Sequence, residues 1–351
     1  MNEATTHMDH GAFAPRAAFV HKTTLGLLLL LLLVIFGALS IGRYAIAPLD
    51  VARILLGSGD ADPMATRVIE SVRLPRVLLA LLVGAGLAAA GASLQSIFRN
   101  PLAEPQLLGV SSGAAFGGIL ALLIWGDGLP LIAGALVFGM MALLAVFWLA
   151  GGKMAHRTGS AVLLVLAGIV VSGVFAAGVS LVKLVADPQN QLPAIVFWLM
   201  GSLSSANQER LWLALPCIGL SLALLHGLRF QLLALSLSEE DARALGVKVG
   251  PGRLLALLAV GLITAASVAV CGIVGWVGLV VPHLVRMGLG TDHRNFLLNV
   301  MVGGAAYLIV VDTLARSAME VEIPLGVLTS LLGAPLFAFL VRRIGHGVEG
   351  G

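Results

Sequence analysis

The stretch SLSEEDARALGVKVGPGR, from Ser236 to Arg253, separates two long apolar runs. Six of its 18 residues are charged, whereas charged residues make up 11% of the whole chain. Each acid or base at a bilayer centre costs roughly 2.5–3.5 kcal/mol on insertion scales, so this stretch is expected to lie outside the membrane. Ser238 followed by three acids indicates a helix start, and Gly246 indicates its end. The sequence therefore predicts a small folded polar segment between two membrane helices.

The composition of the rest of the chain is that of a membrane protein. Hydrophobic residues make up 59% of the 351 residues and the mean hydropathy is +1.02, whereas soluble domains have roughly 45–50% apolar residues. The apolar runs are continuous, which excludes the alternating pattern of a β-barrel. The predicted fold class is an all-α polytopic membrane protein.

Ten apolar runs are candidates for transmembrane helices. They divide the chain into an N-terminal tail (1–23), a transmembrane domain (24–344) and a C-terminal tail (345–351), and no cleaved signal peptide is predicted. A further apolar piece, 193–203, is too short to cross a bilayer and is expected at the interface or as a re-entrant segment. The ten runs are 24–42, 74–97, 107–125, 129–150, 161–186, 211–228, 253–273, 277–290, 295–316 and 325–344.

The placement of Lys and Arg predicts the orientation. With both termini in the cytoplasm, 13 of the 21 basic residues lie on the inner side and 8 on the outer side, which agrees with the positive-inside rule. The polar segment 236–253 is then cytoplasmic. The outer loop 43–76 contains five of the outer cations, and two of them, Arg73 and Arg76, flank a proline in RLPR. Cations at a helix start interact unfavourably with the helix dipole. These arginines therefore either lie on a solvated surface or have a specific function.

The second and seventh apolar runs resemble each other. Arg76 begins RVLLALLVGAGLAAAG and Arg253 begins RLLALLAVGLITAAS. Five helices separate the two starts, so the copies would run in opposite directions, as in the inverted repeats of many transporters.

Several chemistries are disfavoured by the motifs that the chain lacks. No phosphate-binding loop of the form G-x-x-x-x-G-K-[ST] occurs, so ATP hydrolysis would need another chain. The predicted spans contain almost no acid or base, which disfavours coupling to a proton or sodium gradient. No metal, cofactor or nucleic-acid site is predicted, and no clustered catalytic constellation at membrane depth supports an integral membrane enzyme.

Four separated motifs carry a family resemblance. RLPR with LVGAGLAAAGASLQSIFRNPLAEPQLLGVSSGA, LGV at 245–247, GWVGLVVPHLVRMGLGTDHR and EIPLGVLTSLLGAP resemble the FecCD-like permeases of type II ABC importers over residues 25–344. The resemblance implies a homodimer of ten-helix subunits with an inverted repeat in a bacterial inner membrane. It also implies two cytoplasmic ATPase subunits, a periplasmic substrate-binding protein, and a cargo that is haem, a ferric siderophore or cobalamin.

The same resemblance implies roles for particular residues. Arg73, Arg76 and Arg316 are expected to pair with acidic residues of the binding protein. Asn100 and Leu102, with Ser160 at the start of the fifth helix, are expected in the cytoplasmic gate; a simple capped loop is the alternative for the first two. Segment 236–252 is expected to form short coupling helices that contact the ATPase, through Ser238, Glu239, Glu240, Ala242, Arg243, Leu245, Gly246 and Val247.

The leading hypothesis is the permease subunit of an ATP-driven importer of an iron chelate. The alternatives are a cobalamin importer of the same family and, in another class, a self-contained secondary carrier of a small solute.

Overall fold

A computed structural model gives the structure of the protein and describes residues 14–57, 62–151, 160–237, 239–247, 249–289 and 295–348. Side chains are described from residue 23 onward, except at 160–161, 239, 340–341 and 343–348. All regular elements in these ranges are helices. This confirms the all-α class predicted from the continuous apolar runs.

Ten apolar helices match the ten predicted runs. In the described ranges, seven helices are long and apolar enough to cross a membrane, and three shorter apolar helices accompany them. The ten are α1 (Ala14–Ser40), α4 (Leu74–Phe98), α5 (Val110–Trp125), α6 (Leu129–Leu149), α7 (Ser160–Val185), α9 (Gln208–Gly227), α12 (Val249–Cys271), α13 (Val277–Leu289), α14 (Phe296–Ser317) and α15 (Leu325–Val348).

The two end helices are longer than the apolar runs. Helix α1 begins at Ala14, inside the predicted tail 1–23, and α15 continues to Val348, inside the predicted tail 345–351. A helix can continue through polar residues beyond an apolar run, because its backbone hydrogen bonds still form there. The apolar composition of a run therefore does not mark where the helix ends. Residues 1–13 and 349–351 of the predicted tails lie outside the described residues.

Short helices connect the long ones. Helices α2 (Pro48–Leu55) and α3 (Pro63–Arg67), with the π-helical turn η2 (Val68–Arg73), lead into α4 at one end of the molecule. The apolar piece predicted not to cross contains α8 (Gln191–Leu199), between α7 and α9. Helices α10 (Arg229–Leu235) and α11 (Glu239–Ala244) lie at the opposite end, where α11 falls within the predicted polar segment and α10 ends just before it. The 3-10 turn η3 (Pro105–Leu108) precedes α5.

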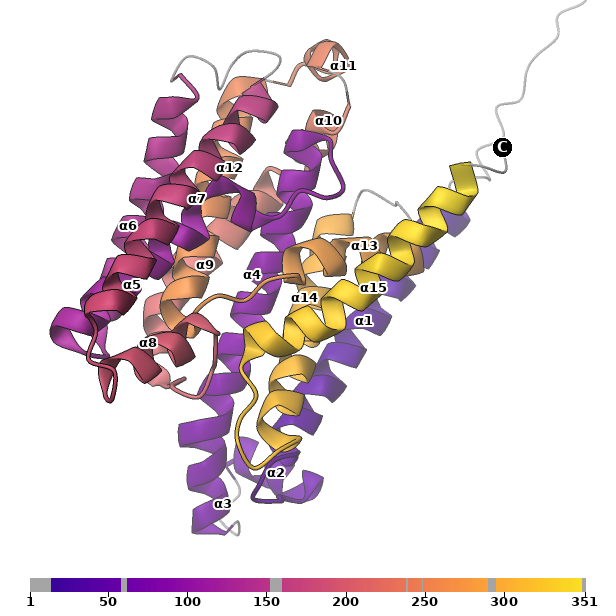
Figure 1. Ribbon diagram of the computed structural model, residues 1–351. Helices are drawn as coiled ribbons and strands as arrows, with labels where there is room; N and C mark the ends of the chain where they lie inside the picture. Colours follow the sequence, from indigo (N-terminus) through magenta and orange to yellow (C-terminus); the bar gives the residue numbers. More distant parts are fainter. Residues whose placement is uncertain are drawn as a thin grey trace, which may run out of the picture.

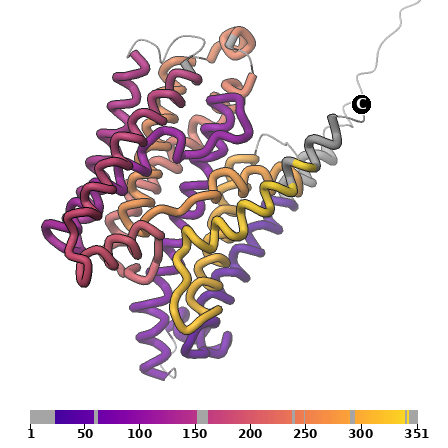
Figure 2. The backbone as a smooth tube through the Cα atoms, viewed as in Figure 1, coloured from indigo at the N-terminus to yellow at the C-terminus, as the bar shows by residue number. Residues whose placement is uncertain are grey.

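Helix α4 lies between two groups of helices (Figures 1 and 2). Helices α5, α6, α7, α9 and α12 form one group, and α1, α13, α14 and α15 form the other, with α4 in contact with both. Glycines allow this close packing. A Cβ on Gly91 of α4 would collide with the carbonyl of Gly278 in α13, and a Cβ on Gly84 would collide with the carbonyl of Gly304 in α14.

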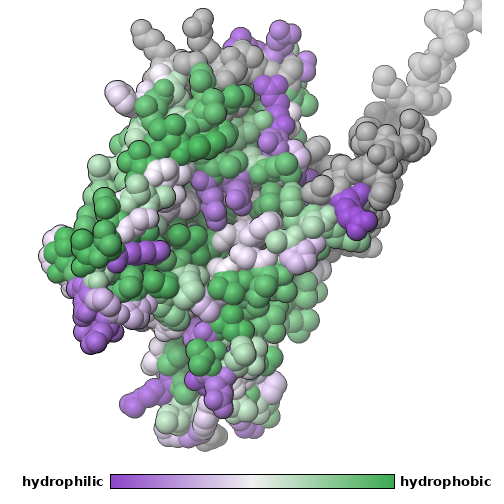
Figure 3. All heavy atoms as spheres, in the orientation of Figure 1, coloured by the Kyte–Doolittle hydropathy of each residue, from purple (hydrophilic) through white to green (hydrophobic). Residues whose placement is uncertain are grey.

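The two helices of the sequence echo, α4 and α12, are both largely buried. The last turns of α4 meet α10, and α12 begins just after α11, so the two helices run in opposite directions, as the echo predicts (Figure 1). Their starting arginines, Arg76 and Arg253, are 8% and 4% exposed. On the visible face, hydrophilic residues gather mainly toward the α11 end and the α2–α3 end, with apolar surface between them (Figure 3).

Candidate functional site

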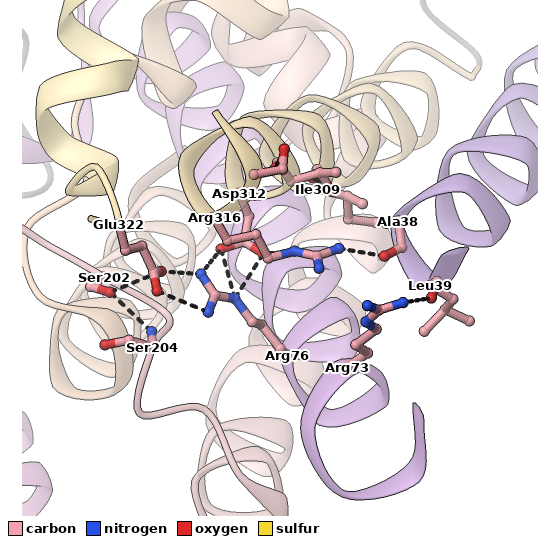
Figure 4. Close-up of polar contacts among 12 residues, drawn as sticks. Ala38, Leu39, Arg73, Arg76, Ser202, Ser204, Ile309, Asp312, Arg316 and Glu322 are labelled. Carbon is pink, nitrogen blue, oxygen red and sulfur yellow. Dashed lines mark hydrogen bonds and ion pairs between the residues drawn. The ribbon is translucent and has the colours of Figure 1, made fainter. Parts of the chain in front are cut away.

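The three arginines predicted for the outer surface lie together where α1, α4 and α14 meet (Figure 4). Arg76 contacts two carboxylates. Its Nε donates to both oxygens of Asp312 at 3.1 and 3.0 Å, and its Nη2 donates to Asp312 at 2.8 Å and also to Glu322. Glu322 accepts a further hydrogen bond from Ser202 at 3.5 Å. Asp312 is 1% exposed, so the Arg76 guanidinium provides the positive charge that a buried carboxylate requires.

Arg73 and Arg316 cap the end of α1. Arg73 donates to the carbonyls of Leu39 at 2.5 Å and Ser40 at 3.1 Å, and also to that of Tyr44. Arg316 donates to the carbonyl of Ala38. The last carbonyls of a helix lack partners within the helix and carry partial negative charge, and α1 has no cation of its own in its last turn. Two arginines from other elements therefore complete the C-terminus of α1.

The sequence analysis expected these arginines to pair with acidic residues of a binding protein, whereas in the structure their side chains contact groups of this chain. Arg73 and Arg76 are 5% and 8% exposed, and the Arg316 side chain is 11% exposed. A carboxylate of another protein could reach them only by displacing the contacts described above. The sequence analysis missed Asp312 and Glu322 as their partners. The spacing of Asp312 and Arg316, four residues apart on one helix, was the available signal.

The predicted coupling segment forms a short helix with a defined end. Gly246 has φ of +77°. Its N–H donates to the carbonyl of Arg243 at 2.9 Å, and the N–H of Val247 donates to that of Ala242 at 3.1 Å. These two bonds form a Schellman motif, which confirms the helix stop predicted at Gly246. Ser238, the predicted cap, lies outside the described residues, and of Glu239 only the backbone is described.

The residues of α11 divide into an inner and an outer set. Ala242 is 1% exposed and packs in the core, whereas Leu245 is 66% exposed. Ala242 was expected at a partner contact, and its burial corrects that expectation, because α11 must pack one face on its own protein. Val247 is half-buried. The outer surface is formed by Glu240, Asp241, Arg243, Ala244, Leu245 and Gly246.

The predicted gate residues lie in the loop that follows α4. Arg99 ends α4 with φ of +50°, which L-residues rarely adopt. The side chain of Asn100 accepts from the N–H of Leu102 at 2.9 Å, so Asn100 fixes a tight turn at Pro101. Leu102 is 53% exposed. The capped-loop geometry is therefore present, and Leu102 projects from it.

The gate loop continues into η3, which contacts α7. Gly168 of α7 lies so close to the carbonyl of Leu107 that no side chain would fit there. Ser160 is the first residue of α7, about two turns earlier, and its side chain is not among those described. The structure thus joins the loop of Asn100 and Leu102 to the helix that Ser160 begins.

A recess of about 540 Å³ opens near the middle of the molecule, between η3, the end of α8 and the start of α15. Backbone hydrogen bonds hold its walls together, since Leu325 and Gly326 donate to the carbonyls of Gly201 and Met200 at 2.8 and 3.0 Å. Trp276, on its wall, has φ of +69° and stacks near Phe337. None of the described residues that line the recess is charged; they are Gln106, Leu199, Met200, Ile273, Gly275, Trp276, Gly326, Val327, Ser330 and Leu331.

Arg99 and Trp276 are the two non-glycine residues with positive φ in the described part of the chain. One ends the helix before the predicted gate, and the other forms a wall of the recess. Backbone strain of this kind concentrates at functional sites. The same ranges hold no group of three side chains able to bind a metal.

The fold is that of a multi-span helical subunit with a recess between its helices and a folded helix pair at one end. The sequence profile of the FecCD transport family matches residues 29–343. The chain belongs to this family, whose members are ABC permease subunits.

The relatives agree over nearly the full length. The molybdate import system permease protein MolB of Haemophilus influenzae is 44% identical over 93% of this chain and 97% of its own. The hemin transport system permease protein HmuU of Yersinia pestis is 39% identical over 92% and 95%. A solved structure described as an inward-facing metal-chelate type ABC transporter is 42% identical, with a TM-score of 0.83 over 92% of this chain and 99% of the other. The type II importer permease fold is therefore confirmed.

Proposed function

We propose that the chain is the permease subunit of an ATP-driven importer that works as a homodimer with two cytoplasmic ATPase subunits and a periplasmic binding protein. Membership of the FecCD family, over residues 29–343, is the observation that carries this function. The missing phosphate-binding loop supports assigning ATP hydrolysis to a separate chain. The protein lies in the inner membrane with both termini in the cytoplasm, as the distribution of Lys and Arg supports.

The outer face of α11 is the contact for the ATPase. Leu245 offers an exposed apolar anchor, and the Schellman end at Gly246 makes α11 a rigid unit rather than a frayed loop. Closure of the ATPase dimer would move α11 and, through α10 and α12, the helices around the gate loop at Asn100 and Leu102. Coupling of this kind requires two discrete arrangements of packed helices.

Docking of the binding protein takes place at the α2–α3 end. Exposed Arg53 and Arg67 offer cations there, and Asp62 fixes the loop by accepting from the Tyr44 hydroxyl and the N–H groups of Met64 and Ala65. Arg73, Arg76 and Arg316 join α1, α4 and α14 beneath this end. They would pair with acidic residues of the binding protein only after giving up their present partners.

The cargo is an iron chelate, haem or a ferric siderophore. The recess of about 540 Å³ suits a bulky ligand, and its lining offers mainly apolar and neutral polar contacts. A small dianion would lose hydration there without a cation to replace it. Molybdate is the second candidate, because a relative with 44% identity is named a molybdate permease.

Reconstitution tests the proposal. The permease, its ATPase and its binding protein in vesicles should import cargo only with ATP, and changing the phosphate-loop lysine of the ATPase should abolish uptake. Uptake by the permease alone, driven by an ion gradient, would establish the secondary carrier instead. Radiolabelled haem, ferric siderophore, cobalamin and molybdate, supplied in parallel, identify the cargo; uptake of molybdate alone would refute the chelate assignment.

A further inference from the structure

A second cavity lies at the α11 end, separate from the recess. It has about 120 Å³ of open volume, well above the roughly 10–15 Å³ that one water requires. The last turns of α4, helix α10, the last turn of α13 and the first turn of α14 surround it. Ser93, on its wall, lies five residues before the end of α4, which places the cavity about 8 Å inside that end.

Two arginines on different elements line this cavity. Arg229 begins α10 and Arg286 lies in the last turn of α13, and both are half-buried. No carboxylate is among the described residues that line the cavity. Two more deeply buried arginines are paired with carboxylates: Arg76 contacts two, and Arg210, which is 5% exposed, donates to Asp127 at 2.6 and 2.8 Å. Two half-buried guanidinium groups, with no carboxylate among the described lining residues, favour the binding of an anion.

Both guanidinium groups are held in position before any ligand arrives. Arg286 donates to the Gln95 side chain at 2.6 Å, and Gln95 in turn donates to the carbonyl of Gly278 at 3.2 Å. Arg229 donates to the carbonyl of His226 at 2.9 Å. The guanidinium carbon of Arg229 lies 4.5 Å from the ring centroid of Phe230, and that of Arg286 lies 5.1 Å from the ring centroid of Phe296. One N–H of the five on each group is used in these hydrogen bonds, so donors remain on both sides of the cavity.

The hydroxyl groups of the cavity do not supply competing donors. Ser93, Ser96 and Ser236 each donate to a carbonyl of their own helical turn, at 2.8, 3.2 and 2.6 Å. The donors that remain are therefore the positive ones on Arg229 and Arg286. A ligand rich in acceptor oxygens, able to accept from two forked guanidinium groups at once, fits this donor set.

We propose that this cavity binds a phosphate group, held between Arg229 and Arg286. The source is either the headgroup of an anionic phospholipid or free phosphate. Basic pockets between membrane helices at the cytoplasmic level recognise anionic lipid headgroups, and Phe296 with the leucines of α10 gives the cavity an apolar wall suited to the start of an acyl chain. A phosphate bound there would link α10, which leads into the coupling helix α11, to α13.

The test uses full-length protein in a non-ionic detergent at fixed ionic strength, with lipid removed. Three ligands are titrated: dimyristoyl phosphatidylglycerol, sodium phosphate, and dimyristoylglycerol, which has the acyl chains without the phosphate. Binding of each is measured by native mass spectrometry and by thermal shift. Saturable binding of one phosphatidylglycerol per chain is expected, with no binding of dimyristoylglycerol. If sodium phosphate competes, the free anion is also a ligand; if it does not, the lipid is the source. Both results support the site.

The variants decide whether the two arginines form it. Arg229→Gln with Arg286→Gln should weaken phosphatidylglycerol binding at least tenfold. Arg342→Gln, which changes an exposed arginine in α15 away from the cavity, should change it less than twofold. Arg229→Lys with Arg286→Lys keeps the charge and loses the forked donors, so it should bind more weakly than the wild type and more tightly than the double Gln variant; its thermal unfolding without lipid serves as the folding control.

Three results would overturn the proposal. They are equal binding by the wild type and the double Gln variant, an equal loss in Arg342→Gln, and binding of dimyristoylglycerol as tight as that of phosphatidylglycerol. If the wild type binds neither phosphatidylglycerol nor phosphate while Arg229→Gln releases the ATPase, the arginines belong to a protein interface and the phosphate site is also refuted.

Discussion

At the scale of single residues, the arginines around the end of α1 show how position changes the use of a charge. Arg73 and Arg76 were expected at a helix start, where cations oppose the helix dipole. In the structure the backbone is helical without a break from Pro63 to Phe98, so both arginines lie inside a long helix. Arg73 stabilises the C-terminus of a neighbouring helix, α1, and Arg76 neutralises the buried Asp312. Tertiary contacts that join α1, α4 and α14 thus determine what each charge does.

Replacing Arg76 by Met should be severely destabilising. The change leaves the Asp312 carboxylate buried without its main partner, and breaking a buried pair from one side costs roughly 3–5 kcal/mol. Arg53→Met removes an exposed pair with Asp50 and should cost about 0–1 kcal/mol. Thermal unfolding of both purified variants in detergent measures the difference. Similar losses for the two variants would contradict the structural role assigned to Arg76.

At the scale of elements, α11 is a short helix that cannot be stable alone, because isolated helices below about 12–15 residues are marginal in water. Two features hold it in place. Ala242 packs into the core, and the Schellman bonds at Gly246 and Val247 close its end. The remaining face is exposed.

Leu245→Asp should release the ATPase from the purified complex without unfolding the permease. An exposed apolar anchor becomes a charge, which a hydrophobic contact would exclude. Leu56→Asp is the matched control, since Leu56 is 83% exposed and lies at the opposite end. Co-purification from detergent is the measurement. Full retention of the ATPase by Leu245→Asp would show that α11 is not the contact.

Gly246→Ala should loosen the end of α11. A Cβ on Gly246 would meet no atom within 4 Å, so the change adds no steric collision. Its cost comes only from the left-handed backbone conformation, which is less stable for L-residues by roughly 1–2 kcal/mol. Amide exchange at Val247 should rise about tenfold, because 1.4 kcal/mol corresponds to a factor of ten. Gly227→Ala, also in open space but helical, should leave exchange in α11 unchanged. An equal response to both changes would exclude backbone strain as the cause.

At the scale of the whole molecule, α4 is the element on which both helix groups pack. Its small residues permit backbone contact with α13 and α14, and in a bilayer such close van der Waals packing takes the place of the hydrophobic effect between helices. The arrangement leaves the recess between the two groups, so the position of α4 determines whether a transport path can exist.

Gly91→Ala and Gly37→Ala should have opposite effects on stability. The added methyl at Gly91 collides with the Gly278 carbonyl, and overpacking typically costs 1–3 kcal/mol. At Gly37 in α1 no atom lies within 4 Å, so the change should stabilise by roughly 0.5–1 kcal/mol through helix propensity. Thermal unfolding in detergent compares them. A neutral Gly91→Ala variant would mean that α4 and α13 can separate without loss.

The sequence alone determined the helical class, the positions of the ten apolar helices, the polar segment between two of them and the family, because continuous apolar runs, glycine stops and local motifs are properties of neighbouring residues. Only the tertiary structure decided what the arginines do, that Ala242 is buried while Leu245 is exposed, and that Arg229 and Arg286 face one cavity. These depend on partners between 29 and 278 positions away in the chain or on which side of a helix meets the core, and no local pattern encodes such distances.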